Sequence, residues 1–406
     1  MKKLLTVFCL FLLCSCTHQK PLFNNKEDLK IIVASDLHYY DPSLFKDCSW
    51  FNGAWEYEDG QMIHYTHLFV ENFISEVISQ KPDMVLISGD LTYNGEKVSH
   101  ESLSKQLQRL TDAQIQVAVI NGNHDVNNGR SLAYDEQGAY GIEDIDVETY
   151  KQLYANFGLN QAYSKDKESL SYALHLNNTY DLLVIDTCRD TSYMTASDLK
   201  ESTMKWIEKE LKSTQSNNKK TLVMMHHNLG IHCEAIYTSY VLENADEMQD
   251  LFAQYDVPVV FSGHIHTQHT KQINNTTEIV TSALSIAPVQ YGIVELNNDT
   301  LHYKTQEIES VTGDEAFFKV TSYNKSYNNF EKNFGSELAH ELASYMATVN
   351  LTYFTGNTYA YRDEFMQNPL LEVINNPSDD IDFHSKYLES ILSETINNLE
   401  IIIDMK

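Results

Sequence analysis

The chain has 406 residues, of which 42% are hydrophobic and 21% are charged, and this is enough apolar material for a packed core. Its 57 acidic residues outnumber its 29 lysines and arginines, which gives a formal net charge of −28. Because so acidic a surface repels polyanions, the composition excludes a protein that coats long nucleic acid. The same charge makes a phosphate ester an unexpected ligand.

The first sixteen residues have the pattern of an export signal. Lys2 and Lys3 precede an apolar run over residues 4–13, about half the ~20 residues that span a bilayer. The last residue of this run begins the segment Leu13-Cys14-Ser15-Cys16, which resembles a bacterial lipobox. We therefore expect a lipoprotein signal peptide over residues 1–16, lipidation of Cys16, a polar tether over residues 17–28, and export to a bacterial membrane by this lipid anchor only. An ordinary cleaved signal peptide is the alternative.

Export also bears on the remaining cysteines. Cys48, Cys188 and Cys233 would stay in the mature chain, so at most one internal disulfide could form. They lack the CxxC spacing that is typical of zinc sites. Buried free thiols are the favoured interpretation.

From residue 30 onward, short apolar runs alternate with segments of helical apolar spacing. The apolar runs predict strands near residues 31–35, 84–88, 115–120, 171–176, 180–187, 221–225, 257–261, 278–281, 291–295 and 301–305. The segments between them predict helices near residues 68–80, 100–111, 147–157, 196–211 and 240–253. This order predicts a layered α/β domain over residues 29–305.

Beyond Gly313 the strand signal fades. Residues 336–349 have a helical period, and apolar residues from Phe383 to Leu399 mark one face of a last helix. We expect a small all-helical domain over residues 315–406, docked on the α/β domain. Such a domain either caps a pocket and restricts it to small substrates or is purely structural.

Five polar clusters stand directly after predicted strands. In an α/β sheet, the carboxyl ends of the strands present ligand-binding groups, so five such ends can converge on one point. Carboxylate, amide and imidazole groups suit Mn, Fe or Zn ions, and the neighbouring glycines permit tight turns. The clusters are Asp36-Leu37-His38, Gly89-Asp90, Gly122-Asn123-His124-Asp125, His226-His227 and Gly263-His264-Ile265-His266.

Taken together, these motifs resemble those of the calcineurin-like metallophosphoesterase superfamily over roughly residues 30 to 305. The resemblance implies a four-layer α/β/β/α sandwich and two metal ions bridged by Asp90. His226 is chosen over His227 because the family ligand is the first residue after the strand. By this resemblance the first ion would be held by Asp36, His38, Asp90 and His266, and the second by Asp90, Asn123, His226 and His264.

The expected chemistry is hydrolysis of a phosphoester. Two cations can share a hydroxide at neutral pH, which attacks phosphorus in line while the ions neutralise the oxygens. The leaving alkoxide needs a proton. His124 is free to supply it, and Asp125 can orient His124.

Two further motifs resemble the exported bacterial branch assigned to cyclic-nucleotide phosphodiesterases, namely residues 89–96 (GDLTYNGE) and 226–229 (HHNL). Asn94, His227 and His232 could bind the phosphate oxygens, although hydrogen bonding within loops is the alternative. The aromatic segment over residues 39–65 either stacks on a base or packs on its own domain.

Three functions stay open. The first is a dimetal phosphodiesterase acting on small phosphodiesters, with cyclic nucleotides favoured. The second is a phosphomonoesterase or nucleotidase on the same centre. The third is a non-catalytic surface lipoprotein, against which the intact ligand set argues. We infer no protein partner, and the acidic exterior disfavours long nucleic acid as a substrate.

Overall fold

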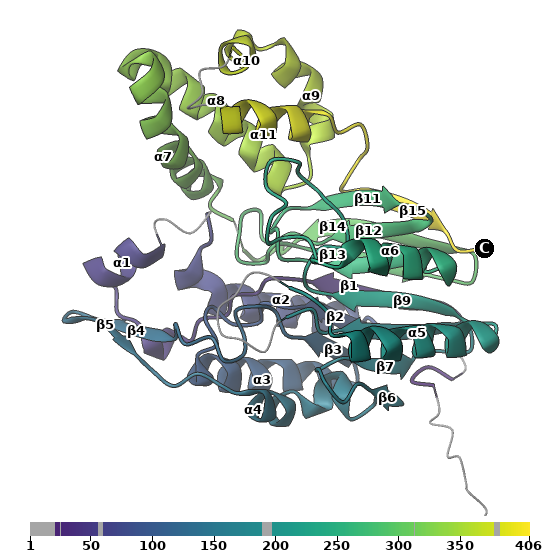
Figure 1. Ribbon diagram of the computed structural model, residues 1–406. Coiled ribbons are helices and arrows are strands. Elements are labelled where there is room, and N and C mark those ends of the chain that lie inside the picture. Colours follow the sequence, from purple (N-terminus) through teal and green to yellow (C-terminus); the bar gives the residue numbers. More distant parts are fainter. Residues whose placement is uncertain (1–20, 25, 56–59, 189–196, 312, 377–381) are drawn as a thin grey trace, which may run out of the picture.

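The computed structural model describes residues 21–24, 26–55, 60–188, 197–311, 313–376 and 382–406. Within these ranges two mixed β-sheets pack face to face, and helices cover their outer faces (Figure 1). The predicted signal peptide, the predicted lipidation site Cys16 and residues 17–20 of the predicted tether lie outside the described residues.

The first sheet is parallel at its centre and antiparallel on one side. In pairing order its strands are β15 (Glu400–Asp404), β14 (Thr300–Glu307), β13 (Gln290–Leu296), β1 (Leu29–Ala34), β2 (Met84–Ser88) and β3 (Gln116–Ile120). β1, β2 and β3 are parallel, so their carboxyl ends meet at one edge. On the other side, β13 pairs antiparallel with β1, β14 with β13, and β15 with β14.

The second sheet repeats this plan. Its strands are β11 (His269–Ile273), β12 (Thr276–Val280), β10 (Val259–Ser262), β9 (Lys220–Met225), β8 (Tyr180–Ile185), β7 (Tyr172–His175) and β6 (Ser164–Lys165). β8, β9, β10 and β12 are parallel, and β11 and β7 pair antiparallel with the ends of this set. The short strands β6 and β11 were not predicted.

Alternating side chains divide the interior into layers. In β8, Leu182 and Val184 are buried between the sheets, whereas Leu183 and Ile185 are buried on the outer side. Successive strand residues point to opposite faces, so each face of β8 has its own core. The outer core is closed by α5 (Glu201–Ser216) and α6 (Ala245–Gln254).

The outer face of the first sheet is covered in the same way by α2 (Thr66–Gln80) and α3 (Lys97–Asp112). The buried apolar residues of these two helices belong to the same hydrophobic cluster as the residues between the sheets. The predicted four-layer α/β/β/α architecture is confirmed. The predicted helix over residues 240–253 starts later, at Ala245, because Asn228 holds the preceding loop through backbone hydrogen bonds with Tyr240 and Leu242.

The aromatic segment packs mainly on its own domain. Tyr40 and Phe51 are buried, and the rings of Phe45 and Phe51 stack with centroids 4.2 Å apart. This cluster includes α1 (Ser49–Trp55) and the hairpin of β4 (Leu132–Asp135) and β5 (Gly138–Gly141), while α4 (Val147–Leu153) lies beside α3. Trp50 is exposed.

A helical lobe follows β14 in the chain and stands above the body in Figure 1. Its helices are α7 (Glu315–Phe334), α8 (Ser336–Phe354), α9 (Thr358–Gln367), α10 (Pro369–Ile374) and α11 (Asp382–Leu392). The prediction of an all-helical segment to residue 406 is wrong at its end. α11 stops at Leu392, and residues 400–404 form β15, which returns to the first sheet beside β14.

Hydrogen bonds tie the lobe to the second sheet. The amide of Gln268 donates to the carbonyl of Phe354 at 3.0 Å, and the amide of Thr270 donates to Oδ1 of Asn398 at 2.9 Å. Cys233, from the loop after β9, is buried within the core of the lobe. The lobe is therefore fixed to the body at several points.

The described residues correct the predicted tether and place the thiols. The backbone amides of Leu22 and Phe23 donate to the end of β7 at 2.9 and 2.8 Å, so the chain is docked from this point and the predicted tether to residue 28 is too long. Cys48, Cys188 and Cys233 are free thiols, of which Cys233 is buried. Among the described helices, none has both the length and the apolar content to cross a membrane.

Candidate metal centre

Seven polar side chains meet where five parallel strands end. Asp36 and His38 follow β1, Asp90 follows β2, and Asn123 follows β3. From the facing sheet, His226 follows β9, and His264 and His266 follow β10. The parallel strands of both sheets thus deliver their carboxyl ends to one edge of the sandwich.

These side chains form two groups that share one carboxylate. Ligand atoms of Asp36, His38, Asp90 and His266 lie within 4.8 Å of one another, and so do those of Asp90, His226 and His264. The Oδ1 atom of Asn123 lies 3.1 Å from Nε2 of His226, which places Asn123 beside the second group. The structure therefore brings together all seven predicted ligands in the predicted pairing, with Asp90 common to both groups.

The contacts within the groups fit cations. Nε2 of His38 lies 3.2 Å from Nε2 of His266, so two imidazole nitrogens face each other. Nε2 of His266 lies 3.4 Å from Oδ1 of Asp36, and Nε2 of His226 lies 3.4 Å from Oδ2 of Asp90. Nitrogen lone pairs and carboxylate oxygens converging on one point, with no thiolate, match the ligand set of Mn, Fe or Zn.

Backbone carbonyls orient two of the imidazoles. Nδ1 of His226 lies 2.8 Å from the carbonyl oxygen of Ser88, and Nε2 of His264 lies 2.9 Å from that of Ser239. Each bonded nitrogen donates to its carbonyl, so the other ring nitrogen is left for the centre. Sequence reasoning missed Ser88 and Ser239, because a backbone carbonyl leaves no signal in the residue type.

Burial and the local charges set the protonation states of the candidate ligands. Burial opposes ionisation of Asp90, but His226 and His124 outweigh it and hold the pKa of Asp90 well below its usual range. Burial lowers the pKa of His38 and of His264 to about 3, so both rings are neutral. For His226, burial is outweighed by the Asp90 carboxylate, which raises the pKa to about 9. An entering cation would displace the His226 proton.

The backbone of the ligand loops is strained. Five ligands adopt left-handed φ values, a conformation that costs about 1–3 kcal/mol for a residue with a side chain. The surrounding packing therefore holds a geometry that the loops would not adopt alone. The residues are Asp36 (φ 49°), His38 (φ 41°), Asp90 (φ 44°), His264 (φ 69°) and His266 (φ 63°).

Two glycines allow the loops to approach each other closely. A Cβ atom at Gly122 would lie 2.1 Å from Oδ1 of Asp90, and one at Gly263 would lie 1.8 Å from Oγ of Ser35. Neither distance is compatible with a side chain, so glycine is required at both positions by contact with the centre rather than by its φ angle.

His124 lies at the edge of the centre with 31% of its side chain exposed. Its amide donates to Oδ1 of Asp90 at 3.0 Å, and its Nε2 atom lies 4.0 Å from Oδ2 of the same carboxylate. Its Nδ1 atom lies 2.7 Å from the carbonyl oxygen of Tyr93 and 3.1 Å from Oδ1 of Asn94. Nδ1 therefore donates to these oxygens, and Nε2 is the atom on the side of the metal ligands.

The predicted role of Asp125 is wrong. Its buried carboxylate accepts hydrogen bonds from the amides of Leu91, Thr92 and Gly122 at 3.0, 2.9 and 2.7 Å. The contacts that orient His124 come instead from Tyr93 and Asn94. Asp125 clamps the loop after β2 to the loop after β3, and so fixes Asp90 relative to Asn123.

The three predicted substrate-binding residues have other partners. Asn94 contacts His124, as described above. His227 is fully buried, with Nδ1 2.8 Å from Oγ1 of Thr187. Its ring centroid lies 4.2 Å from that of His264, so His227 packs against a candidate metal ligand.

The two ring nitrogens of His232 lie 2.9 Å from Oε2 of Glu278 and 2.7 Å from Nδ1 of His269. Both nitrogens are occupied within the protein, so the prediction that His232 binds phosphate is not supported. His269 in turn pairs with Glu394 at 2.8 Å, and this buried chain joins the body to the segment after α11.

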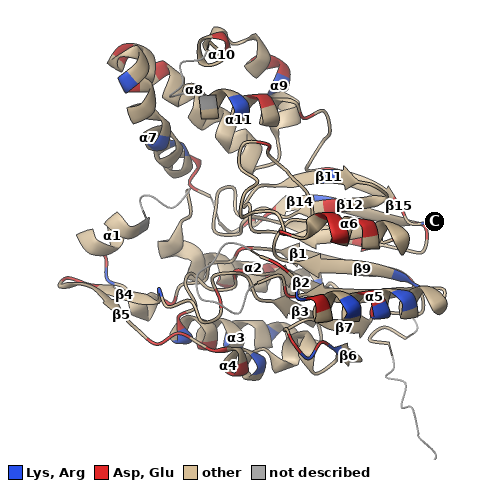
Figure 2. Cartoon of the chain, viewed as in Figure 1, with Lys and Arg blue, Asp and Glu red and all other residues tan. Residues whose placement is uncertain are grey.

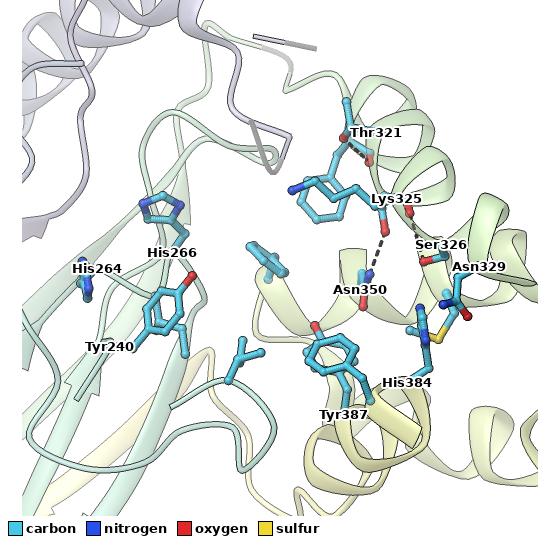
Figure 3. A pocket seen from close by; sticks show the side chains of 17 residues that line it. Tyr240, His264, His266, Thr321, Lys325, Ser326, Asn329, Asn350, His384 and Tyr387 are labelled. Atoms are coloured by element: carbon cyan, nitrogen blue, oxygen red, sulfur yellow. Dashed lines mark hydrogen bonds between the residues drawn. The ribbon is translucent and has the colours of Figure 1, made fainter. Parts of the chain in front are cut away.

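A cavity of about 420 Å³ lies between the centre and the helical lobe (Figure 3). His264 and His266 line it on the side of the body, and Lys325, Asn350 and His384 line it on the side of the lobe. Sequence reasoning missed the lobe residues, since polar residues on amphipathic helices are typical of any exposed helix face.

Comparisons with known proteins agree with this geometry. The model of the calcineurin-like phosphoesterase family matches residues 29–268. A protein of Ruthia magnifica subsp. Calyptogena magnifica named "Probable cyclic nucleotide phosphodiesterase" is 25% identical over 202 residues, 50% of this chain and 69% of the relative. A relative of the same name from Xenorhabdus bovienii (strain SS-2004) is 24% identical over 206 residues, 50% of this chain and 68% of the relative.

Among solved structures, a dimetal phosphatase from Danio rerio shares the fold with a TM-score of 0.50 and 11% identity, over 69% of this chain and 96% of that one. The family match covers both sheets from β1 to β10 and contains every residue of the two ligand groups. The chain belongs to the calcineurin-like phosphoesterase family and is a metal-dependent phosphoester hydrolase.

Proposed function

We propose that this chain hydrolyses small phosphodiesters, with cyclic nucleotides as the substrate class. The observation that carries the proposal is the pair of ligand groups that share Asp90, with the partly exposed ring of His124 at their edge. The names of the two relatives also point to cyclic nucleotides. The matches to these relatives cover 50% of this chain. The substrate of the whole molecule is therefore part of the proposal.

Mn, Fe and Zn all accept the ligands of this centre, and we propose two ions drawn from these metals. When bound, they would supply a nucleophile at neutral pH and neutralise charge on the phosphoryl oxygens. The chain itself contributes the orientation of the ligands. Ser88 and Ser239 fix the rings of His226 and His264, and the clamp at Asp125 fixes Asp90.

His124 acts as the general acid in this proposal. In the imidazolium form its Nδ1 proton is held by the carbonyl of Tyr93, so the ring cannot turn away. The second proton then sits on Nε2, on the side of Asp90, where the ester oxygen of a bound substrate leaves. Transfer from Nε2 to that oxygen avoids release of a free alkoxide.

The test compares bis-p-nitrophenyl phosphate with p-nitrophenyl phosphate in the presence of Mn²⁺, followed by 3′,5′-cyclic and 2′,3′-cyclic AMP. We expect preference for the diester and turnover of a cyclic nucleotide. Preference for the monoester would indicate a phosphomonoesterase, and inactivity toward all four compounds would indicate a non-catalytic protein.

Asp90→Asn is the matched test of the centre. Because Asp90 belongs to both ligand groups, we expect a loss of at least about 100-fold in activity. Asp250→Asn, an identical change at an exposed position of α6, serves as the control and should retain activity. Equal activity of the two variants would contradict the proposal.

We also propose export and lipid anchoring through Cys16, supported by the charge and apolar pattern of residues 1–16. Metabolic labelling with an alkyne fatty acid should mark the wild-type chain, whereas Cys16→Ser should be unlabelled and absent from the membrane fraction. Labelling of Cys16→Ser would contradict this proposal.

A further inference from the structure

The cavity between the metal centre and the helical lobe has the position of a site for the substituent of a bound phosphate. His264 and His266 form part of its wall, so a phosphoryl group at the centre would place its organic group in this space. Its volume of about 420 Å³ lies within the ~300–1,000 Å³ that is usual for small-molecule sites.

The walls of the cavity include five phenylalanine and tyrosine side chains. The ring centroids of Tyr240 and His264 lie 5.1 Å apart, and so do those of Phe318 and Phe354. Phe383 stacks on Tyr387 with an angle of 18° between the rings. Such walls favour a flat ring system as the ligand.

Two polar atoms of residues that line this cavity have no hydrogen-bond partner among the residues that the structure describes. Nδ2 of Asn350 donates to Oγ of Ser322 at 2.7 Å, which fixes the amide, and its buried Oδ1 atom has no donor. Nδ1 of His384 is also buried without a partner, and burial lowers the pKa of His384, so the ring stays neutral. An alkyl ligand would leave both atoms unpaired, whereas hydroxyl or amino groups of a nucleoside would pair them.

The charge of the cavity is opposite to that of the chain. The whole chain carries a net charge of −28, yet among the described residues that line the cavity none is Asp or Glu. Lys325 extends from α7 toward the side on which His266 lies (Figure 3). Acidic residues are instead spread over the outer helices of the body and the lobe (Figure 2). This distribution admits an anionic ligand and keeps its entry free of carboxylates.

We propose that α7, α8 and α11 of the helical lobe form a nucleoside-binding site, in which Asn350 and His384 recognise polar groups of the nucleoside and Lys325 contacts its phosphate. The lobe lies outside residues 29–268 that match the family, so this site belongs to the added part of the chain. The proposal deepens the proposed function and rests on it for the position of the phosphate.

A binding measurement tests the site independently of turnover. Isothermal titration of the Mn²⁺-loaded protein compares three non-hydrolysable phosphonates: the analogue of AMP with carbon in place of the ester oxygen, methylphosphonate and octylphosphonate. We expect the AMP analogue to bind at least about tenfold more tightly than methylphosphonate, because it adds stacking and hydrogen bonds. Octylphosphonate should bind less tightly than the AMP analogue.

Variants of the lobe assign this preference to its residues. In Asn350→Leu and in Lys325→Met, the preference for the AMP analogue over methylphosphonate should fall at least about fivefold. Lys319→Met changes the same residue type on α7 away from the cavity, and its preference should match that of the wild-type chain. Lys325 is exposed, so its variant tests the site without a folding defect.

The outcomes separate the two proposals. A preference for the AMP analogue that both lobe variants lose supports the site even if no diester is hydrolysed, in which case the proposed function alone fails. Equal binding of the AMP analogue and methylphosphonate overturns the site even if diesters are hydrolysed. Tighter binding of octylphosphonate assigns the cavity to an alkyl group and also overturns the proposal.

Discussion

Oδ1 of Asn94 lies 3.1 Å from Nδ1 of His124, on the opposite side of the ring from the Nε2 atom that faces Asp90. With the Tyr93 carbonyl, this contact sets the direction in which His124 presents a proton. The loop after β2 therefore supplies both a candidate metal ligand, Asp90, and the groups that orient the proposed acid, His124.

His124→Ala should lower kcat for bis-p-nitrophenyl phosphate by about 10²–10⁴-fold, because the leaving group loses its proton donor. Elemental analysis should find unchanged metal content, since the change leaves the amide of residue 124 on Asp90. His340→Ala, at an exposed position of α8, is the control. Normal turnover of His124→Ala would show that the acid is another group.

Asp125→Asn should destabilise the fold by about 1–3 kcal/mol, because an amide group would face backbone donors that now have a carboxylate acceptor. Thermal unfolding measures this loss, and titration with Mn²⁺ should reveal weaker binding. At saturating Mn²⁺ we expect a much smaller loss of kcat than in His124→Ala. A loss as large as that of His124→Ala, with normal stability, would restore a catalytic role for Asp125.

Glu96→Gln should stabilise the protein more as the pH rises. Burial raises the pKa of Glu96 from 4.5 to about 8, so between these values the folded chain binds a proton that the unfolded chain has lost. The free energy of unfolding of the wild-type chain therefore falls between pH 4.5 and about pH 8. The glutamine variant does not show this fall, because its side chain binds no proton in either state. One pKa unit corresponds to about 1.4 kcal/mol, and we expect at least this gain at pH 8.

Thermal unfolding at pH 5, 6, 7 and 8 gives the difference between Glu96→Gln and the wild-type chain. Glu136→Gln, at an exposed position, should show a difference that is flat across this range. A flat difference for Glu96→Gln as well would mean that Glu96 is ionised in the folded chain.

His232→Leu should cost about 1–3 kcal/mol of stability, since the buried carboxylate of Glu278 loses the ring 2.9 Å from its Oε2 atom and keeps the amides of Leu229 and Gly230 as donors. KM for a small diester should not change. His302→Leu, which breaks the exposed pair with Glu400 at 2.7 Å, should cost no more than about 1 kcal/mol. A raised KM with normal stability would return His232 to the substrate site.

The clustering of the candidate metal ligands is predictable from the sequence because its signal is local. Each ligand stands within four residues of the end of a buried strand, and the strand is visible as an apolar run. Asp36 and His264 can be placed at the same edge of the sandwich without knowing their distant partners. Each follows a strand of a parallel set, and the carboxyl ends of such strands meet at one edge.

The errors arose where the partner is distant in sequence. The sequence predicts that His232 binds phosphate because nothing near it indicates Glu278, 46 residues away, or His269. Adjacency in the sequence predicts that Asp125 orients His124, whereas the carboxylate oxygens of Asp125 accept hydrogen bonds from backbone amides up to 34 residues away. Backbone donors carry no sequence signal, so such a clamp is visible only in the structure.

The end of the chain is mispredicted for a different reason. Ile391, Leu392, Ile396 and Leu399 fit a helical period, and this stripe hides both the end of the helix at Leu392 and the strand that begins at Glu400. The β-branched run over residues 401–403 is typical of a strand and could have revealed β15.

The return of β15 to the first sheet makes the helical lobe an insertion between two adjacent strands rather than an appended domain. β14 leads into the lobe and β15 leads out of it, and these strands pair directly. Contacts away from these two strands also hold the lobe, since Cys233 of the body lies in the core of the lobe and the amide of Gln268 donates to the carbonyl of Phe354. The lobe therefore cannot move as a rigid unit without breaking these contacts, and the wall that it gives to the cavity is held in place by the body itself.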